Sequence, residues 1–369
     1  MNNVMQVLIV AGARPNFMKV APIIHCIRQR ASKQAEPPLT YSLVHTGQHY
    51  DESMSAVFLR ELDIPQPAFN LGVGSGTHAV QTARVMQAFE PVCQQVRPDW
   101  VVVVGDVNST MACTLVCAKL GVKVAHVEAG LRSFDRGMPE EINRIVTDAL
   151  ADLLLTPSQD GNENLIREGV PPNRIRLVGN VMIDALTANL ATARRSEILH
   201  SLELAPKSFA FVTLHRPANV DNKDTLTSVT NVLAKLAVDV PVVFAVHPRT
   251  RKMCVQFGIE LSGHRGLRVV DPVGYHDSLR LTEAAAFVLT DSGGLQEEST
   301  YFRTPCLTLR PNTERPVTVT TGSNQLTTLD RLPADIKQAL RDKAGRGQIP
   351  ELWDGKSATR IVDCLIEAR

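Results

Sequence analysis

The sequence predicts an α/β protein built from two doubly wound parallel sheets. Short runs rich in Val, Ile and Leu alternate with helix-length amphipathic segments along its 369 residues. Several of these runs lack alternating polar positions, which is typical of strands covered on both faces in a parallel sheet. The chain is too long for one core, and the pattern restarts near residues 178–205, so we expect two domains.

The expected strands fall into two groups, one on each side of this restart. Each strand is short and precedes a segment with apolar residues at helical spacing. Because parallel neighbours need crossover connections, we expect right-handed βαβ units throughout. The strands are predicted at residues 6–12, 41–47, 100–106, 122–128, 152–158 and 175–180 in the first group, and at 209–215, 241–247, 267–271, 285–291 and 305–310 in the second.

The restart also sets the domain limits. A polar segment at residues 193–208 is predicted to form a helix between the two groups of strands. We expect an N-terminal domain over residues 1–180 and a C-terminal domain over residues 181–355. The last helical segment, 356–369, is expected to pack back on the N-terminal domain.

The composition narrows the classes of function. With 39 Lys and Arg against 38 Asp and Glu, the formal net charge is +1. The chain therefore has no excess of positive charge that would indicate binding to nucleic acid or to an anionic membrane. No apolar run reaches the length of a membrane span, and the N-terminus has no basic leader. The seven cysteines are scattered and mostly lie in apolar runs, which is typical of core residues rather than of disulfides or zinc ligands. We therefore expect a cytoplasmic protein.

Polar side chains follow seven of the predicted strands. One such residue is routine, but ligands bind beyond the carboxyl ends of the strands in open parallel sheets. Repeated charged and imidazole groups at these ends predict two binding rims, which would face each other across a cleft between the domains. The residues are Arg14, Gln48 with His49, Asp106, Glu128, His215, His247 and the turn at 291–294.

The turn "TDSGGLQEEST" at residues 290–300 predicts an anion site. Ser292, Gly293 and Gly294 open a helix, where N–H groups lack partners and glycine lets a phosphate approach closely. Arg14 and Lys19 of the opposite domain are suited to further phosphate contacts. A tight turn that merely requires glycine is the alternative interpretation. No P-loop or H-E-x-x-H motif is present, and "GSGTHA" at 74–79 follows a poor strand, so we expect no cofactor and no metal.

The stretch "HVEAGLRSFDRGMPEEINR" at residues 126–144 combines carboxylates with arginines. Pro139 predicts the first turn of a helix, where the dipole favours acidic residues. Asp106, Glu128 and Glu140 are expected to converge on one pocket and to divide proton removal and delivery between them. Glu141, about 100° further around the helix, is expected to lie outside the site. A solvated loop with paired surface charges is the alternative.

A series of blocks carries a family resemblance that runs in order over nearly the whole chain. The blocks are "GARPNFMKVAPI", "HTGQHYD", "GDVNST", "HVEAGLRSFDRGMPEEINR", "VGNVMIDAL", "TLHRPAN", "HPRT", "TDSGGLQEE" and "NTERPVTVTTGSNQL". Together they resemble the non-hydrolysing UDP-N-acetylglucosamine 2-epimerases. The resemblance implies a glycosyltransferase B-like (GT-B-like) fold, with two Rossmann-like doubly wound domains facing a central nucleotide-sugar cleft, and a homodimer.

The resemblance also implies a reaction. UDP-N-acetylglucosamine is reversibly converted to UDP-N-acetylmannosamine, for surface polysaccharide precursors, by anti elimination of UDP to 2-acetamidoglucal and re-addition. The hydrogen at carbon 2 is not next to a carbonyl and has low acidity, so expelling a stabilised diphosphate helps to remove it. The step needs a carboxylate base, a proton donor, and cations or N–H dipoles for the departing charge. It requires no metal and no nicotinamide.

Residues at positions that match the family's motifs are expected to have the roles of their counterparts in the family. Asp106, Glu128 and Glu140 match its acidic catalytic residues, and His215 matches a histidine near the leaving diphosphate. Glu298 is expected to hold the ribose hydroxyls. The residues expected to bind the UDP-sugar are Arg14, Lys19, Arg144, His247, Ser292, Gly293, Gly294, Glu298 and Arg315.

Two departures from the family pattern leave the substrate and the regulation open. The form "GARP" also resembles a branch that acts on UDP-2,3-diacetamido-glucuronic acid. Pro217 and Ala218 replace charged residues near which some bacterial members bind an activating second UDP-N-acetylglucosamine, so hyperbolic kinetics are expected. Three further functions would use the same cleft: a hydrolysing 2-epimerase that releases N-acetylmannosamine and UDP, a GT-B glycosyltransferase, and a non-enzymatic nucleotide-sugar sensor.

Overall fold

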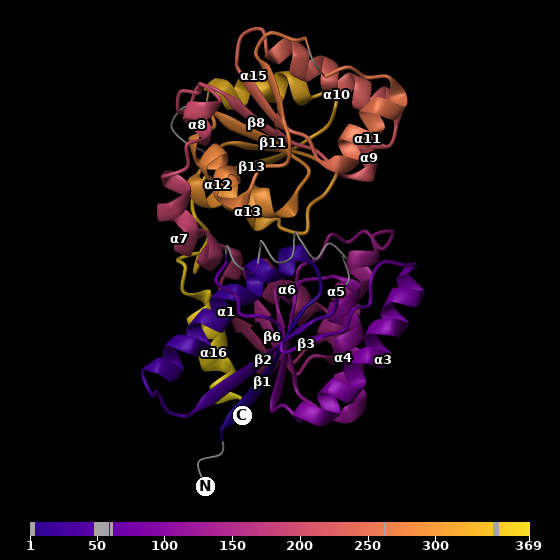
Figure 1. Ribbon diagram of the computed structural model, residues 1–369, viewed down its shortest axis with the longest axis vertical. Helices are drawn as coiled ribbons and strands as arrows, with labels where there is room; N and C mark the ends of the chain where they lie inside the picture. The colour runs from indigo at the N-terminus through magenta and orange to yellow at the C-terminus, as the bar shows by residue number, and fades with distance from the viewer. Residues whose placement is uncertain (1–3, 48–58, 60–61, 262, 342–346) are drawn as a thin grey trace. The chain divides into compact units, whose positions relative to one another are not determined.

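The chain folds into two parallel sheets whose strands alternate with helices (Figure 1). The computed structural model describes residues 4–47, 59, 62–261, 263–341 and 347–369. The seven-stranded sheet has the order β3-β2-β1-β4-β5-β6-β7, and the six-stranded sheet has the order β10-β9-β8-β11-β12-β13. Each order starts inside its sheet and winds outward in both directions, as in doubly wound folds. The predicted α/β fold class is confirmed.

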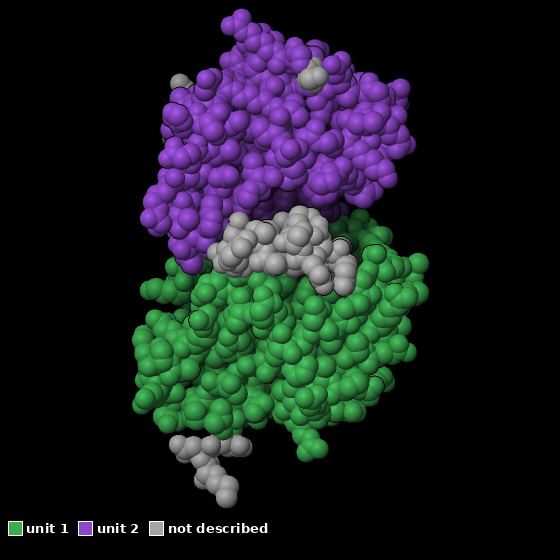
Figure 2. All heavy atoms as spheres, in the orientation of Figure 1, with its two compact units in different colours: residues 1–185, 351–369 green, residues 186–350 purple. Residues whose placement is uncertain are grey.

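The first compact unit comprises Met1–Ala185 and Glu351–Arg369 (Figure 2). Its strands are β1 (Met5–Ala11), β2 (Leu39–His45), β3 (Phe69–Asn70), β4 (Trp100–Val104), β5 (Val124–Val127), β6 (Leu153–Thr156) and β7 (Ile175–Leu177). Its helices are α1 (Arg14–Ser32), α3 (His78–Val96), α4 (Asn108–Leu120), α5 (Pro139–Leu150), α6 (Gln159–Arg167), the 3₁₀ helix η1 (Pro172–Arg174) and α16 (Ser357–Glu367).

The second unit comprises Leu186–Pro350, and helix α7 (Val181–Arg194) spans the division between the units. Its strands are β8 (Ala210–Thr213), β9 (Val242–Ala245), β10 (Leu267–Val270), β11 (Phe287–Thr290), β12 (Cys306–Leu309) and β13 (Asn324–Thr327). Its helices are α8 (Ile198–Ser201), α9 (Pro217–Val220), α10 (Lys223–Leu236), α11 (Pro248–Phe257), α12 (Tyr275–Ala284), α13 (Gly293–Phe302), α14 (Val317–Thr320) and α15 (Leu332–Arg341).

The apolar strands form the cores of both units. In the first unit, every residue of β4 is buried, and Val101 and Val103 pack in one cluster with Phe89 of α3 and Val116 of α4. Helices α1 and α16 lie on the other side of this sheet (Figure 1). Covering both faces removes the need for polar positions, which explains the continuous runs of valine.

Two features of the sequence prediction are wrong. The helix predicted at residues 193–208 is replaced by α7, which starts at Val181, and by the short α8. The Asn180 side chain accepts a hydrogen bond from the N–H of Met182, so the helix begins earlier than the polar stretch suggests. The edge strand β3 was treated only as a poor strand before residue 74, and β13 was not predicted, because one has two residues and the other has the polar sequence NQLT.

The C-terminal segment is held to the first unit by specific polar contacts. The N–H groups of Ser357 and Ala358, at the start of α16, donate to the Asp184 carboxylate at 3.0 and 2.7 Å. The Trp353 indole N–H donates to the Pro157 carbonyl at 3.0 Å. These bonds satisfy donors at a helix start that would otherwise have no partner. Throughout the described ranges, no helix combines the length and apolarity needed to cross a bilayer.

Candidate functional site

Each sheet has a switch point where the strand order reverses. In the first unit this point lies between β1 and β4, and in the second between β8 and β11. The crevice beyond the carboxyl ends of such strands is where open α/β sheets bind ligands. Asp106 follows β4, whereas His215 and Asp291 follow β8 and β11. Both predicted rims therefore contain a switch point.

A buried ion pair marks the rim of the first unit. Lys19 of α1 pairs with Glu128 at the end of β5, and both side chains are buried. Glu128 has a φ of +68°, a left-handed conformation that costs energy for a side chain of this kind and is concentrated at functional sites. Within the described part of the chain its Oε1 is buried without a hydrogen-bond partner. The pair thus fixes one carboxylate oxygen and leaves the other available.

Gly105 makes room for this pair. A Cβ at this position would lie 2.8 Å from Lys19 Nζ, and the residue has a φ of +67°. Only glycine meets both conditions without displacing the ammonium group. The end of β4 is therefore shaped around the Lys19–Glu128 contact.

Arg144 of α5 joins Asp106 to a second carboxylate. Its Nη1 donates to Asp106 Oδ2 at 2.5 Å, and its Nη2 donates to Glu141 Oε2 at 2.5 Å. Arg144 is buried, whereas 29 % of the Asp106 side chain is exposed. Asp106 is therefore held on one side by a cation and open to solvent on the other.

Glu141 does not lie outside this arrangement, as the sequence suggested, but is part of its support. Its carboxylate accepts the N–H of Ser133 at 3.0 Å and that of Phe134 at 2.9 Å, besides the two bonds from Arg144. Burial opposes ionisation, but the Ser133 N–H and the Arg144 guanidinium outweigh it and lower the pKa of Glu141. Helix α5 begins at Pro139 as predicted, and Glu140 is exposed.

In the second unit, Asp291 orients His215. The buried carboxylate accepts the N–H groups of His215 and Arg216, and its Oδ1 lies 2.9 Å from His215 Nδ1. Burial opposes ionisation, but the His215 contacts outweigh it and lower the pKa of Asp291. The His215 side chain is 38 % exposed, so Nε2 is the ring nitrogen left for a ligand.

His247 lies beside His215, with 5.2 Å between the ring centroids. It is the N-cap of α11, and its Nδ1 accepts the N–H of Arg249 at 3.2 Å. A neutral ring in that role carries its proton on Nε2 and can donate it. The two imidazoles therefore provide neighbouring nitrogens at the second rim.

The two glycines of the predicted anion turn differ in their surroundings. Helix α13 begins at Gly293, and its N-cap Ser292 makes no side-chain capping bond. A Cβ at Gly293 would lie 2.7 Å from Arg315 Nη1, whereas a Cβ at Gly294 would meet nothing within 4 Å. Gly293 therefore packs against a guanidinium group, and Gly294 faces open space.

Arg315 belongs to a buried network of charges beneath this turn. Its Nε lies 2.8 Å from Glu297 Oε1, and its Nη1 donates to Glu314 Oε1 at 2.5 Å. Arg310 donates to the other oxygen of Glu314 at 2.8 Å. Against the effect of burial, Arg315 and Arg310 hold the pKa of Glu314 far below its usual range. The charge of Arg315 is thus balanced within the second unit.

Glu298, one turn into α13, has the opposite environment. Burial, and then the charge of Glu297, raise the pKa of Glu298 to about 8. Burial and Glu298 in turn raise the pKa of the Tyr275 phenol, whose oxygen is buried without a partner in the described part of the chain. Glu298 is therefore mostly protonated at neutral pH in the unliganded protein.

The structure brings several predicted residues together within each unit. The pairs are Lys19 with Glu128, Asp106 with Arg144, His215 with His247, and Gly293 with Arg315. Gln48, His49 and the side chain of Arg14 lie outside the described residues. The sequence reasoning included Asp291 only as part of the turn at 291–294 and gave it no role of its own, placed Glu141 outside the site, and did not select Glu314. The role of Asp291 could have been found, because it directly precedes the Ser-Gly-Gly turn.

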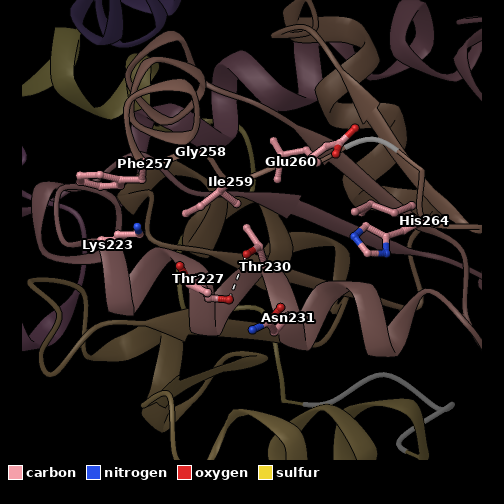
Figure 3. A pocket seen from close by; sticks show the side chains of 11 residues that line it. Lys223, Thr227, Thr230, Asn231, Phe257, Gly258, Ile259, Glu260 and His264 are labelled. Atoms are coloured by element: carbon pink, nitrogen blue, oxygen red, sulfur yellow. Dashed lines mark hydrogen bonds between the residues drawn. The ribbon is translucent and has the colours of Figure 1, made fainter.

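A separate pocket of about 320 Å³ lies in the second unit between α10 and the segment that follows α11 (Figure 3). Thr227, Asn231 and Lys223 line it from α10, and Glu260 and His264 line it from the other side. None of the predicted site residues belongs to this lining. The pocket is therefore distinct from the rim at the switch point.

Comparisons with known proteins give matches over almost the whole chain. The sequence profile of the family described as UDP-N-acetylglucosamine 2-epimerase matches residues 31–366. A UDP-N-acetylglucosamine 2-epimerase of Methanocaldococcus jannaschii is 40% identical, over 98% of this chain and 99% of its own. A UDP-2,3-diacetamido-2,3-dideoxy-D-glucuronate 2-epimerase of Pseudomonas aeruginosa is also 40% identical, with the same coverage. The crystal structure of the M. jannaschii UDP-GlcNAc 2-epimerase in complex with UDP-GlcNAc and UDP gives a TM-score of 0.87 at 39% identity, covering 98% of this chain and 100% of that one.

Proposed function

The chain belongs to the UDP-N-acetylglucosamine 2-epimerase family and is an isomerase, and from this premise we propose that it inverts carbon 2 of UDP-N-acetylglucosamine to give UDP-N-acetylmannosamine. The observation that carries the proposal is the rim of the first unit. There, Lys19 and Arg144 hold the carboxylates of Glu128 and Asp106 at the switch point of the sheet. Fixed carboxylates in a binding crevice suit the removal and return of a weakly acidic proton.

The proposed reaction has two steps, the elimination of UDP and its re-addition. A carboxylate takes the proton from carbon 2, the new double bond forms between carbons 1 and 2, and the bond from carbon 1 to the diphosphate breaks with its electron pair on UDP. Re-addition reverses these steps, with the proton delivered to the other face of carbon 2. We assign the proton transfers to Asp106, Glu128 and Glu140. The exposed face of Asp106 and the unpartnered Oε1 of Glu128 support this assignment.

The second unit is proposed to hold the nucleotide. His215, oriented by Asp291, and the N-terminal N–H groups of α13 would stabilise the charge that develops on the departing diphosphate. Glu298 would accept hydrogen bonds from the ribose. The remaining substrate contacts are proposed for the sequence-selected set Arg14, Lys19, Arg144, His247, Ser292, Gly293, Gly294 and Arg315.

Further features of the proposal rest on the family resemblance. Residues 1–180 with 356–369 would form the catalytic domain, and residues 181–355 the nucleotide-binding domain. The enzyme would act as a cytoplasmic homodimer in the supply of surface polysaccharide precursors. UDP-sugars are made from intracellular nucleotides, which supports that location.

A second substrate is favoured by a specific observation. The P. aeruginosa relative named for UDP-2,3-diacetamido-2,3-dideoxy-D-glucuronate is as similar to this chain as the M. jannaschii one, at 40% identity. The same elimination at carbon 2 would serve either sugar. The 3-acetamido and carboxylate groups distinguish the two substrates, so the sugar itself is the variable to test.

The test is proton NMR of each UDP-sugar incubated with the enzyme in deuterated water. We expect deuterium at carbon 2 of both UDP-linked epimers of N-acetylglucosamine. Exchange in the diacetamido-glucuronate alone would assign the second substrate, and free N-acetylmannosamine with UDP would indicate a hydrolysing enzyme. Absence of exchange in both sugars would contradict epimerisation of either.

A further inference from the structure

A buried histidine lies directly behind the rim of the first unit and has no part in the proposed proton transfers. His126 is on β5, two residues before Glu128, and is 0 % exposed. Its Nδ1 lies 2.6 Å from Asp148 Oδ1, and its Nε2 lies 2.9 Å from the carbonyl oxygen of Gly105. A carbonyl oxygen and an ionised carboxylate can only accept hydrogen bonds.

The surroundings of Asp148 favour its ionised form. Its Oδ2 accepts the N–H of Gly130 at 3.0 Å and a bond from Arg132 Nη1 at 2.7 Å. Burial opposes ionisation, but the contacts with His126 and Arg132 outweigh it and lower the pKa of Asp148. A neutral imidazole carries one N–H and would leave one of its two contacts without a proton. The hydrogen bonds of His126 therefore require protons on both ring nitrogens.

The Gly105 carbonyl belongs to the peptide that leads into Asp106. The N–H of Gly105 donates to the Val127 carbonyl at 3.1 Å, so β5 holds this residue through both its N–H and its C=O. The Asp106 carbonyl in turn accepts the side chain of Asn143 from α5 at 2.9 Å. The backbone on both sides of Asp106 is thus fixed by β5 and α5.

Helix α5 contacts both His126 and the Asp106 carboxylate. Asp148 holds His126, and Arg144, one turn earlier on the same helix, holds the Asp106 carboxylate. His126 therefore closes a ring of contacts from α5 through β5 and Gly105 to Asp106, and back to α5. A shift of the His126 ring would rotate the Gly105–Asp106 peptide relative to Arg144.

We propose that His126 is a positioning residue, a buried imidazolium that fixes the Gly105–Asp106 peptide and so directs the Asp106 carboxylate toward the substrate. The directing role rests on the function proposed for Asp106, whereas the charge of the ring does not. A merely structural role would lower stability and leave turnover per folded molecule unchanged. The two roles therefore differ in kcat.

The first experiment compares His126→Gln with Asp152→Ala. Asp152 is the matched control, because its carboxylate accepts the N–H of Val124 at 2.8 Å at the opposite end of β5. We expect His126→Gln to lose about 10–100-fold in kcat per UDP-binding site, the scale of a small misplacement of a reacting group, with UDP affinity within about threefold. Asp152→Ala should keep kcat. Normal kcat in His126→Gln would overturn the proposal.

A double-mutant cycle separates this proposal from the assignment of Asp106. If His126 acts through Asp106, adding His126→Gln to Asp106→Asn should reduce turnover by less than about twofold further. Independent, additive losses would show that His126 acts elsewhere. Normal turnover of Asp106→Asn alone would instead overturn the function proposed for Asp106.

The charge of the ring is tested on the wild-type enzyme, without any variant. In protein labelled with ¹⁵N-histidine and with ¹³C at the glycine carbonyls, NMR at pH 7 should show protons on both ring nitrogens of His126. The Nε2 proton is assigned by its through-bond coupling to the Gly105 carbonyl across the hydrogen bond. A single N–H on this ring would contradict the buried imidazolium even if both variants failed to fold.

Discussion

Each sheet has a rim, the edge formed by the carboxyl ends of its strands, and the two rims hold their charged groups in different ways. In the first unit, carboxylates meet cationic side chains, as Glu128 meets Lys19 and Asp106 meets Arg144. In the second, Asp291 is held largely by N–H groups, and the glycine turn presents the N-terminus of α13. Fixed carboxylates suit proton transfer, whereas free N–H dipoles suit an anion. The difference supports the proposal that the first unit provides the proton transfers and the second unit binds the departing diphosphate.

The difference also predicts how each edge responds to mutation. Removing one partner of a buried ion pair leaves an uncompensated charge and is costly. The dipole of a helix N-terminus is built into the backbone and is present whether or not an anion is bound. Substitutions of the paired charges in the first unit should therefore change proton transfer or stability, and those that alter only the open face of the α13 N-terminus should mainly change nucleotide binding.

The largest effect is expected from the three carboxylates assigned to proton transfer. Asp106→Asn, Glu128→Gln and Glu140→Gln keep the shape of each side chain but remove its proton function. Each should lose roughly 10²–10⁴-fold in turnover, measured as the initial rate of deuterium exchange at carbon 2. UDP affinity by calorimetry should stay within a few-fold, because the proposal assigns these groups to the sugar and not to the nucleotide. Near-normal turnover of all three would contradict the division between the two edges.

The next effect is on stability and concerns Glu141. Glu141→Ala removes the partner of buried Arg144 and the acceptor for Ser133 and Phe134, and should cost about 3–5 kcal/mol of unfolding free energy. The neighbouring variant Glu140→Gln is the control and should stay within about 1 kcal/mol. Urea denaturation measures both. Equal stability of the two variants would show that Glu141 does not support the rim.

The contrast between Glu140 and Glu141 shows where sequence reasoning stops. The helix start at Pro139 was predictable from local chemistry, and the apolar runs marked nearly all the strands. The burial of Glu141 depends on the preceding loop, in which Phe134 adopts a φ of +58° and directs its N–H to the carboxylate. No local pattern encodes that conformation, because it results from the tertiary packing of the loop on α5.

The same limit applies to the second unit. The Ser-Gly-Gly turn could be predicted from the sequence, because glycine at the start of a helix permits a tight turn and a close approach of a ligand to the backbone. The network of Arg310, Glu314 and Arg315 could not be, since residues close in sequence meet Glu297 only after β12 and α13 pack together. The polar strand β13 was not predicted for a similar reason. The side chain of Asn324 forms its hydrogen bonds with Thr308 and Gln296, which belong to other elements.

A smaller effect separates the two glycines of the anion turn. Gly293→Ala places a methyl group against Arg315 and should cost about 1–3 kcal/mol of stability. Gly294→Ala meets nothing within 4 Å in the protein and should leave stability unchanged. If a phosphate sits over Gly294, the same methyl group should lower UDP affinity by about tenfold, or roughly 1.4 kcal/mol. Unchanged affinity by calorimetry would show that the diphosphate binds elsewhere.

The last prediction concerns the carboxyl group at the second edge whose pKa is raised. For Glu298 the pKa rises from an ordinary 4.5 to about 8, because of burial and the charge of Glu297. Between these values the folded protein keeps a proton that the unfolded chain has lost, so stability falls as pH rises. One such proton contributes at most about 1.4 kcal/mol per pH unit.

Glu298→Gln removes this proton, so the stability of the variant relative to wild type should increase from pH 5 to pH 8 and level off above that. Glu141→Gln provides the opposite sign for the first unit. Because the pKa of Glu141 is lowered, its stabilisation is present above about pH 4.5 and is lost as the pH falls through the folded pKa. Urea denaturation of the three proteins at each pH gives both slopes. Parallel pH profiles for wild type and Glu298→Gln between pH 5 and 8 would mean that Glu298 ionises freely, and the contrast between Glu298 and Glu141 would then fail.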